Sequence, residues 1–358
     1  MKLWINIGLS LAMLALCVWL VWPSAETREQ LGHVIDNYSL AHLAPYLGAY
    51  VALLVVVQLC RALRWNNLLA PLGVRIPAAP LLAISSVGFM AILALPARLG
   101  EFVRPGLLRK RGDLSASAAL GTVAVERVID GLIVSLFVFI ALAALPHKES
   151  WTMPTAYAAL GIFSAALVFL AFAIRRPQAT VGFCMRLSLL PRIAPRIASV
   201  IESKLLEMVR GFDVLRDRRN MAVFVVWSLV YWTANGLGVW VLARAFGLPL
   251  SVVGAFATMG VCAVGIMLPN APGLIGQFQY FTLLGAGLYL GFDATNPPVT
   301  AYLFANLHYL MQVGWYVLCG ALGLASPYVS FHDLWSVRKK VASPGSGGET
   351  AVDAPDPG

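Results

Sequence analysis

The stretch Leu95–Gly131, LPARLGEFVRPGLLRKRGDLSASAALGTVAVERVIDG, places charged side chains between two strongly apolar runs, Leu81–Leu95 and Leu132–Leu145. Burying an ion costs on the order of several kcal/mol, so charges in such a setting need partners or water. Prolines and glycines also interrupt the stretch, and lipid cannot satisfy the backbone groups that they expose. The pattern predicts a broken or re-entrant segment that lines a polar cavity.

The composition is that of a membrane protein. The chain has 358 residues, of which 59% are hydrophobic and only 12% are charged, whereas about a quarter of the residues of a soluble domain are charged. Several apolar runs approach the roughly 20 residues that cross a bilayer as a helix. The net charge of +9 favours attraction to anionic lipid and gives no indication of nucleic-acid binding. The predicted fold class is an all-α polytopic membrane protein.

Residue patterns that carry enzyme chemistry are absent from the sequence. It has no phosphate-binding GxxxxGK[ST], no HExxH and no GxSxG motif. The five cysteines are scattered without a CxxC pair, so neither a disulfide framework nor a metal site is indicated. We therefore expect no catalytic residues, no metal and no cofactor, and we do not expect an enzyme.

Run lengths and loop charges predict about six full spans plus two broken hairpins. The expected spans are Leu3–Trp22, Leu43–Leu63, Ser117–Leu145, Pro154–Ile174, Met221–Phe246 and Val299–Leu324. Arg61, Arg64 and Trp65 end the second span as an expected basic and aromatic interface anchor, and the two arginines are also candidate substrate-binding residues. The arginine- and lysine-rich segment 175–220 predicts the cytoplasmic side. We expect a bacterial inner-membrane protein with both termini in the cytoplasm.

Apolar residues recur at steps of three and four within this basic segment. They are Ile197, Ile201, Leu205, Met208, Phe212 and Leu215. This spacing predicts an amphipathic helix over 191–216 on the inner leaflet, and the alternative is packing against a soluble partner. The C-terminal tail, 331–358, is predicted to be disordered from its composition.

The remaining transmembrane domain, 1–330, divides into halves of about 1–150 and 151–330. Each half holds three full crossings and one broken hairpin, and each hairpin breaks at a Leu-Pro pair, Leu95-Pro96 and Leu268-Pro269. An odd number of crossings turns the second half upside down relative to the first. Such inverted repeats are typical of secondary transporters, whose sites lie where the broken helices meet.

Arg98, Glu101 and Arg104 follow the first break at steps of three. On a helical turn they share a face, and the two guanidiniums could grip a phosphate while Glu101 compensates their charge. The alternative is an ordinary loop whose arginines extend to the membrane surface.

Glu126, Arg127 and Asp130 lie in the first half of the third span. Arg127 and Asp130 are spaced to pair on one helix, which leaves Glu126 to pair with Arg98 or Arg64. These three residues form either a functional or structural ion cluster, or a charged group at the membrane edge.

The second break supplies the remaining candidate site residues. They are Asn270, Pro272, Gly273, Gly276, Gln277 and Gln279. Broken-helix ends present unpaired amides and carbonyls to a cavity, and the glutamines add neutral hydrogen-bonding groups.

Taken together, the motifs resemble the lysylphosphatidylglycerol synthase transmembrane-region family. They are Arg61-x-x-Arg64-Trp65, Leu95-Pro96-x-Arg98-x-Gly100-Glu101-x-x-Arg104, Thr122-Val123 with Glu126-Arg127-x-x-Asp130, and Pro272-Gly273-x-x-Gly276. The resemblance implies a flippase-like domain, as in bacterial multiple-peptide-resistance proteins that move aminoacylated phosphatidylglycerol. Leu274 and Gln279 stand where members often have Gly and Glu, so the charge of the family's substrate is not inferred for the substrate of this chain. The aminoacyltransferase domain of the two-domain synthases is absent from these residues.

The function expected from the sequence is translocation of an anionic, phosphate-headed lipid, either a phospholipid or a polyisoprenyl-phosphate-linked lipid. The alternative is a non-transporting accessory protein that holds envelope-biosynthesis enzymes together. The expected partners are membrane lipids, with such enzymes in the second case, and the oligomeric state is left open by the sequence.

Overall fold

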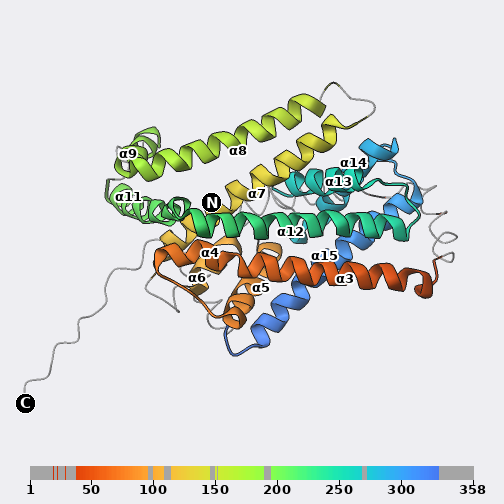
Figure 1. Ribbon diagram of the computed structural model, residues 1–358, viewed down its shortest axis with the longest axis horizontal. Helices are drawn as coiled ribbons and strands as arrows, with labels where there is room; N and C mark the ends of the chain where they lie inside the picture. The colour runs from red at the N-terminus through yellow and green to blue at the C-terminus, as the bar shows by residue number, and fades with distance from the viewer. Residues whose placement is uncertain are drawn as a thin grey trace, which may run out of the picture.

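The computed structural model describes residues 38–95, 100–108, 114–145, 152–188, 195–267 and 272–329, with a few isolated positions. Every regular element in these ranges is helical, which confirms the predicted all-α class (Figure 1). In chain order the elements are α3 (Leu40–Leu63), α4 (Trp65–Leu69), η1 (Ala70–Leu72), α5 (Ala78–Ala94), α6 (Val103–Leu108), α7 (Ala116–Ala143), α8 (Thr152–Arg175), α9 (Pro177–Leu187), α11 (Pro195–Arg210), η4 (Gly211–Arg216), α12 (Arg218–Ala245), α13 (Val252–Gly265), η5 (Pro272–Leu274), α14 (Gln277–Leu290) and α15 (Val299–Ala325).

Four helical stretches of the described part are long and apolar enough to cross a membrane. They are Leu40–Leu72, Met153–Arg175, Arg218–Ala245 and Val299–Ala325, which correspond to the second, fourth, fifth and sixth predicted spans. The third predicted span is α7, whose 28 residues extend roughly 42 Å but include three charged side chains. The first predicted span, Leu3–Trp22, lies almost wholly outside the described residues.

Helices α3 and α12 run antiparallel along the length of the molecule (Figure 1). Their direction is fixed at one end, where Tyr38 donates a hydrogen bond to the carbonyl of Phe246 at 3.2 Å. At the same end, His42 lies 3.2 Å from the carbonyl oxygen of Ala245. The start of α3 therefore lies beside the end of α12.

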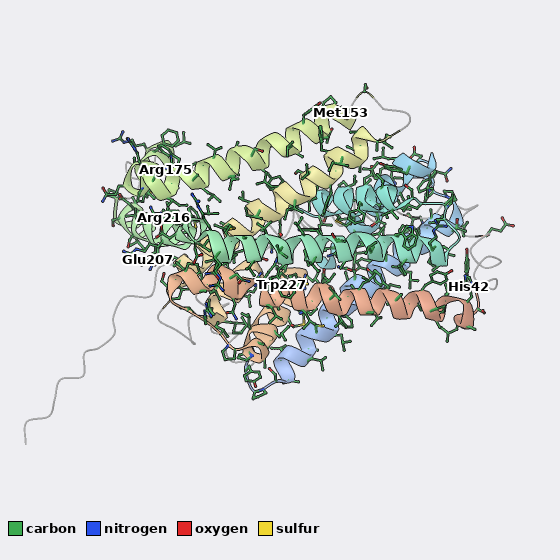
Figure 2. All side chains as sticks on the ribbon, viewed as in Figure 1. His42, Met153, Arg175, Glu207, Arg216 and Trp227 are labelled. Carbon is green, nitrogen blue, oxygen red and sulfur yellow. The ribbon has the colours of Figure 1, made fainter. Side chains whose placement is uncertain are left out.

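The two predicted membrane faces lie at opposite ends of the molecule. Figure 2 places Arg175, Glu207 and Arg216 at one end and His42 at the other, while Met153 lies at the opposite end of α8 from Arg175. The first three belong to the basic segment predicted to be cytoplasmic, whereas His42 and Met153 border the loops predicted to face outward. The arrangement of the helices is consistent with that topology.

The first predicted hairpin is formed by α5 and the segment that follows it. A Cβ atom on Gly100 would overlap the backbone of Ala91 and Ile92, and one on Gly88 would overlap the side chain of Arg104. The chain therefore returns along α5 at a separation that only glycine permits. Residues 96–99, which include Arg98, lie outside the described part.

The second predicted hairpin is formed by α13 and α14, which also pack at close range. A Cβ atom on Gly285 would lie 2.6 Å from the Cα of Thr258. Near the turn, Gly273, Leu274 and Gly276 have φ angles of +66°, +60° and +76°. Leucine rarely adopts this left-handed conformation, so Leu274 is held there at a cost of about 1–2 kcal/mol.

The two hairpins enter from opposite ends of the molecule and meet in its interior. Helix α5 follows the end of α3, whereas α13 follows the end of the antiparallel α12. Leu93, near the end of α5, packs in one buried cluster with Cys262, Leu274 and Phe278 of the second hairpin. The end of α5 and the start of α14 therefore lie together in the interior.

The predicted amphipathic helix over 191–216 is partly corrected by the structure. Helix α11 ends at Arg210 and continues as the 3-10 turn η4, and both pack on α7 and α8. Phe212 is only 2% exposed and Leu205 packs against the same core, while Ile201 stays exposed. Much of the apolar stripe is therefore covered by the protein itself. The spacing of apolar residues is the same whether they pack on protein or on lipid, so it could not predict which.

Glu207 links α11 to the start of α7. Burial raises the pKa of its carboxyl. Hydrogen bonds with Lys204, Ser115 and Ser117 together lower this pKa by more than burial raises it, so it lies below its usual range. The carboxylate is thus charged at neutral pH beside a helix N-terminus, where a negative charge is favoured.

Alanine at Gly121 is expected to destabilise this junction. A Cβ on Gly121 would overlap the carbonyl oxygen of Met208, and one on the facing Gly211 would overlap that of Ala118. Backbone atoms cannot yield as a side chain can, so the cost should be roughly 1–3 kcal/mol. A lowered thermal unfolding midpoint in detergent would show it. Gly161→Ala, with nothing within 4 Å of its Cβ, is the control and should leave the midpoint unchanged or slightly raised, because alanine is more favourable than glycine inside a helix.

Candidate functional site

The buried charges of the described part form one group. Three cations and two anions are at most 5% exposed, so the group carries one excess positive charge. The five side chains are Arg61, Arg64, Arg104, Glu126 and Asp130. All five belong to the set of site residues predicted from sequence.

Arg64 and Asp130 form the most completely bonded pair. The two terminal nitrogens of Arg64 donate to the two carboxylate oxygens of Asp130 at 2.7 and 2.5 Å. Arg64 also donates to the hydroxyl of Ser228 at 2.8 Å, and the indole nitrogen of Trp232 donates to Asp130 at 3.1 Å. These contacts join the end of α3, the middle of α7 and α12 in one network.

Glu126 bridges two arginines. Its Oε1 accepts a hydrogen bond from Arg64 at 3.0 Å, and its Oε2 forms an ion pair with Arg104 at 3.2 Å. The guanidinium of Arg104 also lies 4.2 Å from the ring centroid of Trp65. The predicted pairing of Glu126 with Arg64 is confirmed, while the alternative partner, Arg98, lies outside the described residues.

The predicted pairing of Arg127 with Asp130 is wrong. Arg127 instead lies 3.8 Å from Glu101, and both side chains are partly exposed. The i,i+3 spacing permits the predicted contact, but Asp130 faces the bundle interior, where Arg64 takes both of its oxygens.

The predicted interface anchor at the end of the second span is also wrong, because Arg61, Arg64 and Trp65 are all buried. Arg64 and Trp65 are 1% and 0% exposed, and Trp65 donates a hydrogen bond to Thr122 at 3.0 Å. The span continues past them to Leu72, which places Arg64 roughly 12 Å inside its end. An arginine near the end of an apolar run is ambiguous because the run itself does not show where the helix stops.

The cluster lies deep within the bundle. Asp130 is halfway along α7, and Ser228 is ten residues into α12, which corresponds to roughly 15 Å from the start of that helix. Desolvating each ion costs several kcal/mol, and pairing often does little better than offset this. Buried ion pairs are thus weak stabilisers, and in membrane proteins they mark functional sites.

Arg61 differs from the other buried arginines. Its guanidinium lies 3.4 Å from the ring centroid of Phe89 and 4.3 Å from that of Tyr316. Within the described part, no carboxylate lies within ion-pair distance of it. A cation–π contact contributes about 2 kcal/mol when it is desolvated, which is less than the several kcal/mol that burial of the charge costs.

The glutamines of the second break bond to its backbone. The amide nitrogen of Gln277 donates to the carbonyl of Gly265 at 3.0 Å, and the side-chain oxygen of Gln279 accepts from the backbone nitrogen of Gly276 at 2.9 Å. Both side chains are buried. They satisfy groups that the helix break would otherwise leave unpaired, and a further role in substrate binding stays a prediction.

The other predicted residues of this break are described only in part. The carbonyl of Gly273 accepts a hydrogen bond from Tyr309 at 3.0 Å, which ties the break to α15. Asn270 and the side chain of Pro272 lie outside the described residues, so their predicted roles stay open. The predicted grip of Arg98 and Arg104 on one phosphate also remains a prediction, although Arg104 is already paired with Glu126.

Comparison with known families adds the decisive observation. A family model described as the lysylphosphatidylglycerol synthase TM region matches residues 4–320. The chain belongs to this family. No curated protein and no solved structure matches the chain. Its membership, together with its apolar helices, makes it a multi-pass membrane protein in lipid-related processes.

In this lysylphosphatidylglycerol synthase TM-region protein, the sequence predicted the charged residues of the cluster but not the uncharged residues that contact them. Ser228, Trp232, Phe89 and Tyr316 contact the arginines or Asp130. A serine, a tryptophan or a tyrosine in an apolar helix is commonplace, so only the three-dimensional packing singles out these four.

Proposed function

We propose that this protein is a membrane lipid translocase that moves an anionic, phosphate-headed lipid across a bacterial inner membrane. The observation that carries the proposal is the meeting of two broken hairpins from opposite ends, with buried arginines and carboxylates beside them. Transporters with inverted repeats bind their substrates at such a meeting point. A polar head group can cross an apolar layer only where charged or hydrogen-bonding groups replace its water.

The packing of the helices supports an inverted repeat. The hairpin helix α5 of the first half packs on α15, the last span of the second half. Reciprocally, α13 of the second hairpin packs on α7, the last span of the first half, while α3 packs on α12. These three contacts are those that a two-fold relation between the halves would produce. We infer six spans, two hairpins and cytoplasmic termini from this arrangement and from the loop charges.

Transport by the two hairpins can be tested by joining them reversibly. Leu93→Cys would place a thiol in the same buried cluster as the native Cys262 of the second hairpin. In proteoliposomes that contain fluorescent phosphatidylglycerol, the unmodified protein should move the lipid faster than protein-free liposomes do. A short bis-methanethiosulfonate linker should stop this movement in the variant, and dithiothreitol should restore it.

Leu93→Ser, treated with the same linker, is the control and should retain transport. An unmodified protein that is no faster than protein-free liposomes would favour the accessory-protein alternative. Full transport by the linked variant, with linkage verified by mass spectrometry, would show that transport does not require the hairpins to move relative to one another.

A further inference from the structure

The buried side chain of Arg61 lies near the meeting point of the hairpins. It leaves the last turn of α3 and is 5% exposed. Phe89 of α5 and Tyr316 of α15 lie close to its guanidinium, at 3.4 and 4.3 Å from the ring centroids. Tyr316 also packs against the cluster that contains Leu93, so the arginine adjoins the junction where the two halves meet.

The hydrogen-bonding capacity of Arg61 is largely unused. One terminal nitrogen donates to the side-chain oxygen of Gln58 at 3.2 Å, and its Nε is buried with no partner. Arg64 and Arg104, in contrast, share the two buried carboxylates between them. The single excess positive charge of the buried group is therefore located at Arg61.

The aromatic rings compensate the positive charge of Arg61 only in part. The ring of Phe89 faces two guanidiniums, because Arg104 lies 4.7 Å from its centroid in addition to Arg61. A ring offers only a partial negative potential, and here two cations share it. A buried cation without a counter-ion favours an anion, and the planar fork of arginine matches two phosphate oxygens.

Apart from the guanidinium of Arg104, the polar groups around Arg61 are neutral. Gln58 donates to the hydroxyl of Ser86 at 2.7 Å, and Gln312 donates to the hydroxyl of Tyr316 at 2.5 Å. Tyr50 in turn donates to Gln312 at 2.8 Å. Amide and hydroxyl groups can donate to and accept from the hydroxyls of a ligand, but they offer no negative charge to a cationic one.

We propose that Arg61 binds the phosphate of a lipid whose remaining head group is uncharged and rich in hydroxyls, such as glycerol or a sugar. A cationic aminoacyl head group lacks a counter-charge here, because Glu126 and Asp130 are both held by arginines. The proposal rests on the proposed lipid translocase function and narrows its substrate to anionic lipids without a positive charge.

Binding to the full-length protein in detergent tests this site. The probes are dioctanoyl-phosphatidylglycerol, dioctanoyl-phosphatidylcholine, dioctanoyl-lysylphosphatidylglycerol and inorganic phosphate, with affinities measured by thermophoresis. Phosphatidylglycerol should bind about tenfold or more tightly than either cationic-headed lipid or phosphate alone. Arg61→Gln should lower its affinity about tenfold, and Arg61→Lys nearly as much, because lysine lacks the planar fork.

Arg75→Gln, at an exposed arginine, is the control and should bind like the unmodified protein. Removing an unpaired buried cation relieves a desolvation cost, so Arg61→Gln should unfold at or above the temperature of the unmodified protein. A lower unfolding temperature would assign Arg61 a structural role and overturn the proposal. Equal phosphatidylglycerol affinity in Arg61→Gln would do so as well.

Two further outcomes identify the ligand. Equal affinity for phosphatidylglycerol and the cationic-headed lipids would overturn the head-group selectivity, and inorganic phosphate that binds as tightly as the lipid would assign the site to free phosphate. The transport assay separates this inference from the proposed function. Binding that depends on Arg61 without transport contradicts the function alone, whereas transport that persists in Arg61→Gln with unchanged affinity contradicts the Arg61 site alone.

Discussion

Asp130→Asn is expected to destabilise the protein by roughly 3–5 kcal/mol, because it removes one charge of a buried ion pair. Arg64 would keep its ion pair with Glu126 at 3.0 Å but lose two charge-assisted hydrogen bonds, at 2.7 and 2.5 Å. The indole of Trp232 would also lose its charged acceptor. A large drop in the thermal unfolding midpoint, or loss of monodisperse protein in detergent, is the expected measurement.

Asp213→Asn is the matched control for this substitution. Asp213 forms an ion pair with Arg216 at 3.5 Å, but the two side chains are 46% and 64% exposed. Exposed pairs contribute about 0–1 kcal/mol, so the midpoint should barely change. Equal midpoints for the two variants would show that Glu126 alone neutralises Arg64 and that the Asp130 pair adds little.

The contrast between these two pairs also shows what sequence could predict. Charges inside an apolar chain are costly wherever they lie, so Arg104, Glu126 and Asp130 stood out without any structure, whereas Arg64 was assigned to the membrane interface. The partner of each charge depended on helix rotation and crossing, which no spacing rule supplies. Arg127 and Asp130 were therefore paired wrongly, although both belong to the charged region.

Helix boundaries and helix surfaces also show what the sequence can and cannot predict. The fourth, fifth and sixth spans were located to within a few residues, because a run of about 20 apolar residues is long enough to cross a bilayer as a helix. The second span was not, since it continues to Leu72, past its predicted end at Leu63. Whether an amphipathic stripe such as that of Leu205 and Phe212 faces lipid or protein depends on which element lies beside it. Here that element is α7, whose Gly121 allows a backbone contact that hydrophobic periodicity cannot reveal.

Glu126→Gln is expected to be more harmful than Arg104→Gln, although the two side chains form one ion pair at 3.2 Å. Neutralising Glu126 leaves Arg104 buried without a carboxylate, and three buried arginines then face Asp130 alone. Neutralising Arg104 leaves Glu126 bonded to Arg64 and brings the buried cations and anions into balance. The charge that stays behind unpaired, rather than the removal of the ion pair itself, should therefore decide the cost.

The double variant Glu126→Gln/Arg104→Gln tests this reasoning directly. It removes one charge of each sign, so it should be more stable than Glu126→Gln alone, with a coupling of about 0.5–3 kcal/mol between the two sites. Unfolding midpoints of the unmodified protein, both single variants and the double variant complete the cycle. Additive losses, or a Glu126→Gln variant as stable as Arg104→Gln, would mean that water or lipid already screens these charges. The cluster would then be a solvated site, where Arg104 needs no carboxylate to remain charged.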